Sequence, residues 1–287
     1  MRMGRKLTAE QDRAWALLAA VEDHPRVQEW LASAPAPRAR SHVRWAAAAA
    51  LVLMIGAAFA VAYLQLRPPH YETAVGEQRD VLLPDGSRIT LNTNTALTVR
   101  YTKSVRRIDL ERGEAIFSVK HDAQRAFDVV AGETVARALG TEFNVDLRSD
   151  RTSVSVIEGV VRVSAVSNLE TGQPPDIAAL TKGRTAQIRR GDSHIVEASA
   201  DLNRIRAWRA RRLEFSDTPL PDALAEFNRY STVHVVIGTP ELQTVRVTGV
   251  FSIGDTEAFL FSLREALGAQ TLGSSEEIVL MRAAKQE

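Results

Sequence analysis

The chain has 287 residues, and its 36 Lys and Arg stand against 35 Asp and Glu, which leaves a formal net charge of +1. This balance lacks the strong basic excess that marks many nucleic-acid-binding proteins, so we expect no direct contact with nucleic acid. Cysteine is absent, which excludes disulfides, thiol catalysis and cysteine-ligated zinc.

Residues 1–42 predict a small helical head. Thr8 and Gln11 have the spacing of a capping box, which predicts a helix beginning near Ala9, and Pro25 suits the first turn of a second helix. A segment this short buries little surface by itself, so its apolar side chains are expected to dock on a partner protein. A hairpin lying on a membrane surface is the alternative. The candidate docking residues are Trp15, Leu17, Leu18, Val21, Trp30 and Leu31.

Residues 45–66 form one apolar run without a charged side chain, between Arg44 and Arg67. At about 1.5 Å of rise per residue, such a run matches the roughly 30 Å hydrocarbon core of a bilayer. We therefore expect a single transmembrane helix over 43–66, surrounded by lipid, with the arginine-rich head on the cytoplasmic side. A cleaved signal peptide is the alternative, but its apolar region is shorter and lies nearer the N-terminus.

After a linker over 67–78, residues 79–200 predict a mainly-β domain. Short alternating segments, such as 107–110 and 115–119, are separated by turn residues such as Gly113. Many short strands of this kind indicate a sandwich, roll or solenoid in which one face of each strand is buried.

Residues 201–287 predict a compact α+β domain. We expect strands at 212–215, 233–237, 245–251 and 278–281, with helices at 219–230 and 256–267. Gly268 suits the position that follows the C-terminus of the second helix. The whole chain is thus expected to be a multi-domain membrane protein.

Several motifs resemble the FecR-type (ferric-citrate regulator) anti-sigma factors. In chain order they are LPDGSRITLN at 83–92, RIDLERGEAIF at 107–117, FDV at 127–129, RALGTEF at 137–143 and VSVIEGVVRV at 154–163. The C-terminal pieces LEF at 213–215, TPL at 218–220, FNRY at 227–230 and VTGVF at 247–251 resemble the same family's last domain. That domain is similar to the secretin/TonB short N-terminal fold.

The resemblance implies an anti-sigma factor of a cell-surface signalling system in the inner membrane of a Gram-negative bacterium. Its cytoplasmic head would hold an extracytoplasmic-function sigma factor. Its periplasmic part would receive the signalling domain of an outer-membrane TonB-dependent transducer loaded with an iron source, and site proteases would release the head. The alternatives are an envelope scaffold associated with secretin-like machinery and a membrane-tethered enzyme acting on periplasmic glycans.

For the transducer we expect pairing with a strand edge, and the candidate residues are Val245, Val247, Gly249 and Phe251. Their apolar character equally suits a role in the core of the C-terminal domain.

The sequence gives no sign of an enzyme with an external substrate, a metal site or a cofactor. The six histidines are scattered, and no nucleotide-binding or nucleophile-elbow motif is present. We interpret carboxylates such as Asp146, Glu158 and Asp192 as solvated strand and turn residues. The bond between Gly140 and Thr141 is the one exception, because some members of the resembled family cleave themselves at a Gly–Thr bond in this motif. Gly140 as a simple turn or bulge residue is the alternative.

Overall fold

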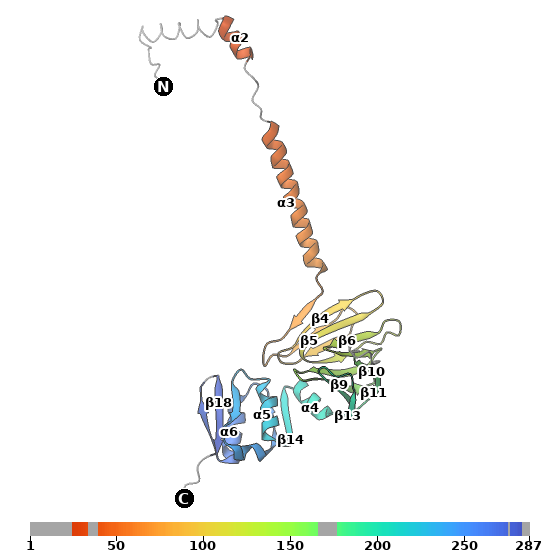
Figure 1. The fold of residues 1–287 in the computed structure, drawn as a ribbon, viewed down its shortest axis with the longest axis vertical. Helices are drawn as coiled ribbons and strands as arrows, with labels where there is room; N and C mark the ends of the chain where they lie inside the picture. The colour runs from red at the N-terminus through yellow and green to blue at the C-terminus, as the bar shows by residue number, and fades with distance from the viewer. Residues whose placement is uncertain (1–24, 34–39, 166–176, 275, 283–287) are drawn as a thin grey trace, which may run out of the picture. The chain divides into compact units, whose positions relative to one another are not determined.

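The computed structural model describes residues 25–33, 40–165, 177–274 and 276–282 (Figure 1). The chain separates into two compact units, Met1–Arg67 and Pro68–Glu287.

The first unit is helical in its described part, with α2 at Pro25–Ser33 and α3 at Arg40–Leu66. Helix α2 begins at Pro25, as the sequence predicts, because proline lacks the N–H that the first turn leaves unpaired and has a φ suited to it. Near its end, the Ser33 hydroxyl donates a hydrogen bond of 2.9 Å to the Trp30 carbonyl.

The predicted fold class needs a correction at the expected transmembrane helix over 43–66. Helix α3 covers this range and starts earlier, at Arg40. Among the residues that the structure describes, no helix has both the length and the apolar character needed to cross a membrane. The single transmembrane helix is therefore not supported, and the chain is mainly β.

The second unit begins with a β domain. Its strands are β1 (His70–Glu72), β2 (Arg79–Leu82), β3 (Arg88–Leu91), β4 (Ala96–Tyr101), β5 (Arg106–Ser118), β6 (Phe127–Ala131), β7 (Thr134–Ala138), β8 (Glu142–Leu147), β9 (Arg151–Glu158), β10 (Val160–Ala165), β11 (Ile177–Thr181), β12 (Arg184–Arg189) and β13 (Val196–Ser199). All pairs are antiparallel except β5 with β6, and the path runs β11-β10-β7-β6-β5-β8-β9-β12-β13.

Strand β5 belongs to both halves of this sheet. Its first part pairs with β4 and β6, and its second part pairs with β3 and β8. Between the two parts, Gly113 has a φ of 85°, and a Cβ there would collide with Thr95. The glycine predicted as a turn is therefore a bend inside one long strand, which lets the sheet fold over itself.

The folded sheet encloses an apolar core. The rings of Phe117 and Phe143 stack with centroids 5.3 Å apart, and Phe127 lies 6.1 Å from Phe117. All three side chains are fully buried. Burial on one face of each strand follows from the alternation predicted by the sequence.

The C-terminal domain follows directly. Its elements are α4 (Leu202–Arg209), β14 (Arg212–Pro219), α5 (Leu220–Asn228), β15 (His234–Ile237), η1 (Pro240–Thr244), β16 (Arg246–Ser252), α6 (Thr256–Leu267), β17 (Ala269–Gly273) and β18 (Glu277–Arg282). Strand β14 pairs with β16, and a separate sheet has the order β15-β18-β17.

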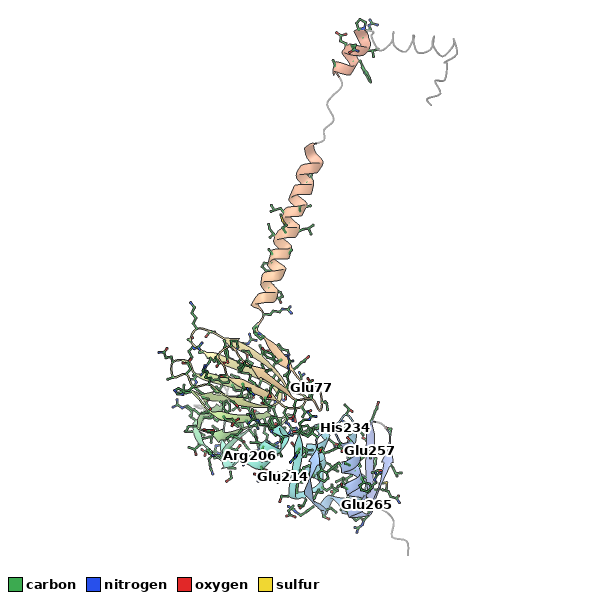
Figure 2. All side chains as sticks on the ribbon, turned by 180° about the vertical axis from the view of Figure 1, so that it is seen from behind. Glu77, Arg206, Glu214, His234, Glu257 and Glu265 are labelled. Carbon is green, nitrogen blue, oxygen red and sulfur yellow. The ribbon has the colours of Figure 1, made fainter. Side chains whose placement is uncertain are left out.

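The α+β pattern expected for this region agrees with these elements, but strand β17 was not predicted. Helix α6 begins after Asp255, whose carboxylate caps the Ala258 N–H, and ends at Gly268, which has a φ of 56°. Its Phe259 stacks on Phe227 of α5 with centroids 4.1 Å apart. Charged side chains such as Glu257 and Glu265 lie on the exposed face of α6 (Figure 2).

Candidate functional site

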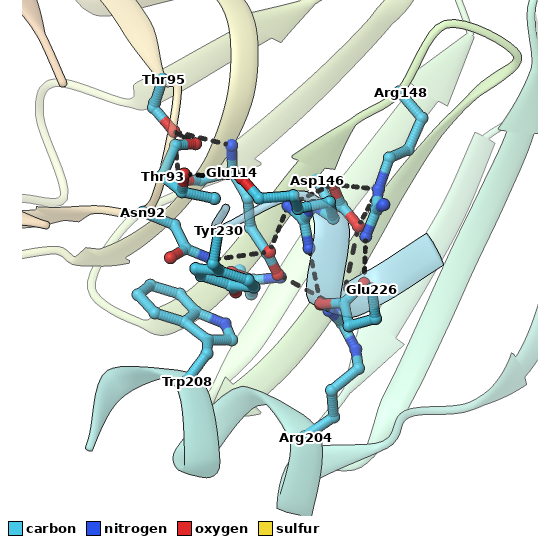
Figure 3. A network of polar contacts seen from close by, with 12 residues as sticks. Asn92, Thr93, Thr95, Glu114, Asp146, Arg148, Arg204, Trp208, Glu226 and Tyr230 are labelled. Carbon is cyan, nitrogen blue, oxygen red and sulfur yellow. Dashed lines mark hydrogen bonds and ion pairs between the residues drawn. The ribbon is translucent and has the colours of Figure 1, made fainter. Parts of the chain in front are cut away.

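A buried polar network joins the β domain to the C-terminal domain (Figure 3). At its centre is Glu114 of β5, whose side chain is 0% exposed. Its carboxylate accepts hydrogen bonds from the side-chain amides of Asn92, at 3.0 Å, and Asn144, at 2.9 Å. These three residues come from segments of the β domain that the sheet brings together.

The opposite charges come from the C-terminal domain. Arg204 of α4 lies 3.2 Å from Glu114, and Arg229, just after α5, lies 2.9 Å from it. Arg229 also pairs with Glu226 at 2.7 Å. A carboxylate buried this deeply needs such partners, because removing an unpaired charge from water costs several kcal/mol.

A second carboxylate extends the network. Asp146 of β8 is 6% exposed at its side chain and lies 2.9 Å from Arg148, which reaches Glu226 of α5 at 3.2 Å. The interpretation of Asp146 as a solvated residue is therefore wrong. Alternation along a strand shows which face is polar, but it does not show that another domain covers that face.

These surroundings shift the ionisation of the buried groups. Burial alone would raise the pKa of Glu114, but Arg204 and Arg229 outweigh it and hold that pKa well below its usual range. Burial, reinforced by the charge of Glu114, raises the pKa of Asp146. Glu114 raises the pKa of Arg204, which stays protonated. Glu114 and the two arginines are therefore charged at neutral pH.

Neutral hydrogen bonds complete this contact between the domains. The Asn92 amide donates to the Tyr230 hydroxyl at 2.7 Å, and the Thr93 hydroxyl donates to the Arg229 carbonyl at 2.9 Å. The Gln78 amide donates to the Trp208 carbonyl at 2.9 Å. Directional contacts of this kind hold the two domains in one orientation.

The motifs of the sequence meet in this network. Asn92 ends the motif at 83–92, Glu114 lies within 107–117, and Arg229 and Tyr230 lie within FNRY at 227–230. Their convergence was not predicted. The motifs contain many polar residues, and nothing in the sequence distinguishes those that meet in this network.

The bond between Gly140 and Thr141 lies between β7 and β8. A Cβ on Gly140 would fall 2.7 Å from Nδ1 of His121, so only glycine fits there. The γ-methyl of Thr141 occupies the space beside Gly159, which has a φ of 87°. The Thr141 hydroxyl is buried and has no hydrogen-bond partner among the described residues.

This bond borders an open cavity of about 410 Å³. The cavity is lined by His121, Arg137, Leu139, Gly140, Thr141, Val160, Arg162 and Ala179. A hydroxyl without a partner, next to a peptide bond at a cavity, is the geometry from which an internal attack on the preceding carbonyl would start.

Comparison with known proteins identifies the β domain. The family model described as FecR protein matches residues 70–162. Residues 70–162 are thus similar to that family, and we refer to this region as the FecR domain.

Two solved structures share the wider fold. Both are crystal structures, at 1.65 and 2.50 Å, of a candidate anti-sigma factor from Parabacteroides distasonis ATCC 8503. Each is 24% identical to this chain and covers 75% of it, with TM-scores of 0.62 and 0.61, and the match takes in 100% and 99% of those chains. A comparison with curated protein sequences gave no match.

Most of the predicted sigma-binding residues cannot be located. Trp15, Leu17, Leu18 and Val21 lie outside the residues that the structure describes. Trp30 lies on α2 and is 70% exposed. Leu31 belongs to the same helix.

The predicted transducer-binding residues lie at or next to β16, beyond the FecR domain. Val247 is buried, and Phe251 packs against Phe215 and Phe259 with centroids 5.9 and 4.9 Å apart. Val245 and Gly249 are half-buried. The opposite, exposed side of the strand carries Arg246, Thr248 and Val250.

Strand β16 pairs with β14 along one edge, and no other described strand pairs with it. A partner strand added at β16 would therefore bind the backbone and meet Val250, which is 60% exposed, rather than the inward-facing residues.

Proposed function

We propose that this protein is an anti-sigma factor that relays a signal from the C-terminal domain to a sigma factor held by the N-terminal unit. The FecR domain at 70–162 carries the proposal. The fold shared with the candidate anti-sigma factor of Parabacteroides distasonis supports the same signalling role.

In this proposal the sigma factor binds the apolar side chains of the head. Trp30 supports it, because a tryptophan that is 70% exposed on a short helix is available as an anchor for a partner. Aromatic anchors of this kind dominate many protein interfaces.

The first test is co-purification of a sigma factor with the full-length protein from cells of the source bacterium. Trp15→Ala and Trp30→Ala are expected to abolish recovery, while Glu29→Ala, an exposed neighbour on α2, serves as the matched control. Retention of a sigma factor by both tryptophan variants would contradict the assignment of the head. If no sigma factor is recovered with the wild type, the envelope scaffold becomes the better proposal.

The signal is proposed to arrive at the free edge of β16 from the signalling domain of a TonB-dependent outer-membrane transducer. The domain contact around Glu114 supports this route, because it joins the C-terminal domain to the FecR domain through ion pairs whose strength depends on the distance between the two domains. Coupling between two sites requires either an element that can adopt two arrangements or an irreversible step that connects the sites. An iron source as the sensed ligand belongs to the same proposal, as does release of the head by proteases.

Val250→Arg tests this route because it places a charge at the exposed edge without entering the core. The variant is expected to stay folded and to lose binding of the purified transducer signalling domain. Leu272→Arg on β17, where the residue is 57% exposed, is the control. Equal loss of binding in both variants would contradict β16 as the binding site.

Self-cleavage at Gly140–Thr141 is a second, separate candidate, supported by the buried and unpartnered Thr141 hydroxyl. The hydroxyl oxygen attacks the Gly140 carbonyl carbon, the C–N bond breaks, and the nitrogen takes the hydroxyl proton. Water then hydrolyses the ester, which leaves a Gly140 carboxylate and a Thr141 amino group. Cleavage of this kind supplies an irreversible step for the relay.

A denaturing gel of the full-length protein tests this activity. Two fragments are expected for the wild type, whereas Thr141→Val, which keeps the shape of the side chain, is expected to give one band. A single band for the wild type would exclude the activity.

The location at a bacterial inner membrane remains a prediction of the sequence, and fractionation of the source cells tests it.

A further inference from the structure

A second cavity lies at one end of the β domain, away from the Gly140–Thr141 bond. Its volume is about 740 Å³, within the range of roughly 300–1,000 Å³ found for small-molecule sites. It is bordered by the middle of β5, the ends of β8 and β12, the start of β9, and the turn between β6 and β7. Walls from several strands give it a rigid frame.

The lining of this cavity is rich in arginine. Its cationic side chains are Arg112, Arg148, Arg151, Arg189 and Arg190. Arginine presents a planar fork of donors that matches carboxylate and phosphate groups in pairs of hydrogen bonds.

Two acids line the cavity as well, and both accept hydrogen bonds from neutral groups while keeping their negative charge. Glu111 accepts one of 2.6 Å from the Thr98 hydroxyl, and Glu133 accepts one of 2.8 Å from the Gly191 N–H. Arg189 and Arg190 make no ion pair with any residue in the described part of the chain. Because Arg112, Arg148 and Arg151 have acidic partners, Arg189 and Arg190 are the cavity's cations available to a ligand.

The strand register places like charges face to face. Arg151 of β9 stands directly opposite Arg189 of β12 in the antiparallel pair. Like charges at opposite positions destabilise a sheet. The ion pair of Arg151 with Asp150, at 2.8 Å, is exposed and relieves little of this repulsion.

One polar residue on the lining is not placed to bind a ligand. Thr134 of β7 is 1% exposed and lines the cavity, and its hydroxyl oxygen has no hydrogen-bond partner among the described residues. This hydroxyl shares the buried face of β7 with Ala136 and Ala138, so it does not reach the cavity. An anion bound between Arg151 and Arg189 would relieve the repulsion between these two side chains.

We propose that this cavity binds a small polyanion that bears carboxylate or phosphate groups, with Arg189 and Arg190 as its main ligands and Arg151 beside them. This site is distinct from the proposed sigma-factor and transducer surfaces. Because Arg148 lines the cavity and also contacts Asp146 and Glu226, a bound anion lies next to the domain contact. The protein would then respond to a small molecule in addition to a protein partner.

Calorimetric titration of the purified full-length protein at low ionic strength tests the site with two probes, pyrophosphate and malonate. Saturable binding of at least one probe is expected. A double variant, Arg189→Gln with Arg190→Gln, is expected to weaken it about tenfold or more, because hydrogen bonds to charged groups contribute strongly. Arg88→Gln, an exposed arginine on β3 outside the cavity, is the matched control and is expected to bind as the wild type does.

The two probes separate the ligand classes. Binding of pyrophosphate alone assigns phosphate chemistry, and binding of malonate alone assigns carboxylate chemistry. No saturable binding of either probe overturns the proposal, as does equal weakening by Arg88→Gln.

A second measurement separates binding from stability. Without ligand, Arg189→Gln is expected to keep or raise the Tm, because it removes the repulsion with Arg151. If Arg189→Gln lowers the Tm and leaves the affinity for the probe unchanged, Arg189 stabilises the fold rather than binding a ligand, and the proposal is overturned.

Discussion

Two faces of one strand, β5, serve opposite purposes. Phe117 faces the core of the FecR domain and stacks on Phe143, whereas Glu114, three residues earlier, faces the C-terminal domain and meets Arg204 and Arg229. Ile116 shares the face of Glu114 and packs into the core of the C-terminal domain. The pleat of a single strand therefore separates an apolar core from a largely polar domain contact.

The difference teaches what each contact is suited for. Apolar burial stabilises without regard to direction, at roughly 25 cal/mol per Å². A buried ion pair gains little net free energy over an apolar substitute, but breaking it from one side is costly. The polar contact therefore favours one orientation of the two domains, which is useful where a signal must pass between them.

The largest loss of stability is expected for Glu114→Ala. The substitution takes the Glu114 carboxylate from Arg204 and Arg229, which keep Glu226 as a partner. The loss is therefore expected to be about 3 kcal/mol, at the lower end of the range for breaking a buried ion pair from one side. Chemical unfolding of the full-length protein measures this loss, and the C-terminal domain is expected to become sensitive to protease before the FecR domain.

A compensated variant sharpens this prediction. Replacing the whole group together, with Glu114→Leu, Glu226→Leu, Arg204→Met and Arg229→Met, removes the ion pairs among these residues and leaves Asp146 paired with Arg148. This variant is expected to recover part of the lost stability, because these four side chains no longer bury a charge. A cost below about 1 kcal/mol for Glu114→Ala would show that the network contributes little to domain docking.

A smaller effect is expected on the other face of β5. Phe117→Leu replaces the ring with a smaller side chain in the FecR core. It is expected to lower the free energy of unfolding by about 1–2 kcal/mol, which is more than the loss of one methyl group and less than truncation of a large side chain to alanine. Protease sensitivity is expected to rise in both domains together, since this core supports the whole sheet. Early release of the C-terminal domain alone would contradict the separation of the two faces.

The domain contact is also expected to respond to acid. Against the effect of burial, the arginines around Glu114 lower its pKa in the folded protein. The ionised Glu114 therefore contributes fully to the free energy of unfolding above the unfolded pKa of about 4.3, and this contribution is lost as the pH falls through the folded pKa. Glu226, whose lowered pKa reflects Arg229 and Arg204 acting against burial, has the same sign. Asp146, whose pKa is raised, has the opposite sign and offsets part of the loss.

Stability measured from pH 7 to pH 3 checks this expectation. The wild type is expected to lose stability below about pH 4 more steeply than Glu114→Gln, which has no acid to protonate at that position. Parallel curves for the two proteins would mean that other carboxylates control the acid response.

The sequence predicted much of the fold because alternation and capping are local signals. Helix α6 with its Gly268 end and the strands of the FecR domain follow from such patterns. Gly113 was misjudged as a turn, since a positive φ fits a bend within a strand as well as a loop. Strand β17 was not predicted because its sequence, AQTLG, contains only one β-branched residue.

The site was harder to predict than the fold. The ligands of the network around Glu114 come from positions as far apart as Asn92 and Tyr230. Nothing in a single sequence shows which polar faces another domain covers, so strand alternation alone predicts Asp146 as a solvated residue. The arginines of the second cavity are unpredictable for the same reason, because Arg151 and Arg189 become neighbours only through the strand register.

The smallest effect is expected at the edge of the domain contact. Arg209 of α4 lies 2.9 Å from Glu142, and their side chains are 45% and 23% exposed. Such a pair is screened by solvent, so a double-mutant cycle with Arg209→Gln and Glu142→Gln is expected to give a coupling of about 0.2–1 kcal/mol that falls as salt is added. A coupling above about 2 kcal/mol that salt does not change would remove the contrast between this exposed pair and the buried pairs of Glu114. Glu142 directly follows Thr141, so the same variants also test whether the C-terminal domain influences cleavage of the Gly140–Thr141 bond. A change in the fraction of protein cleaved would link cleavage to the domain contact. An unchanged fraction would mean that this contact affects only the orientation of the domains.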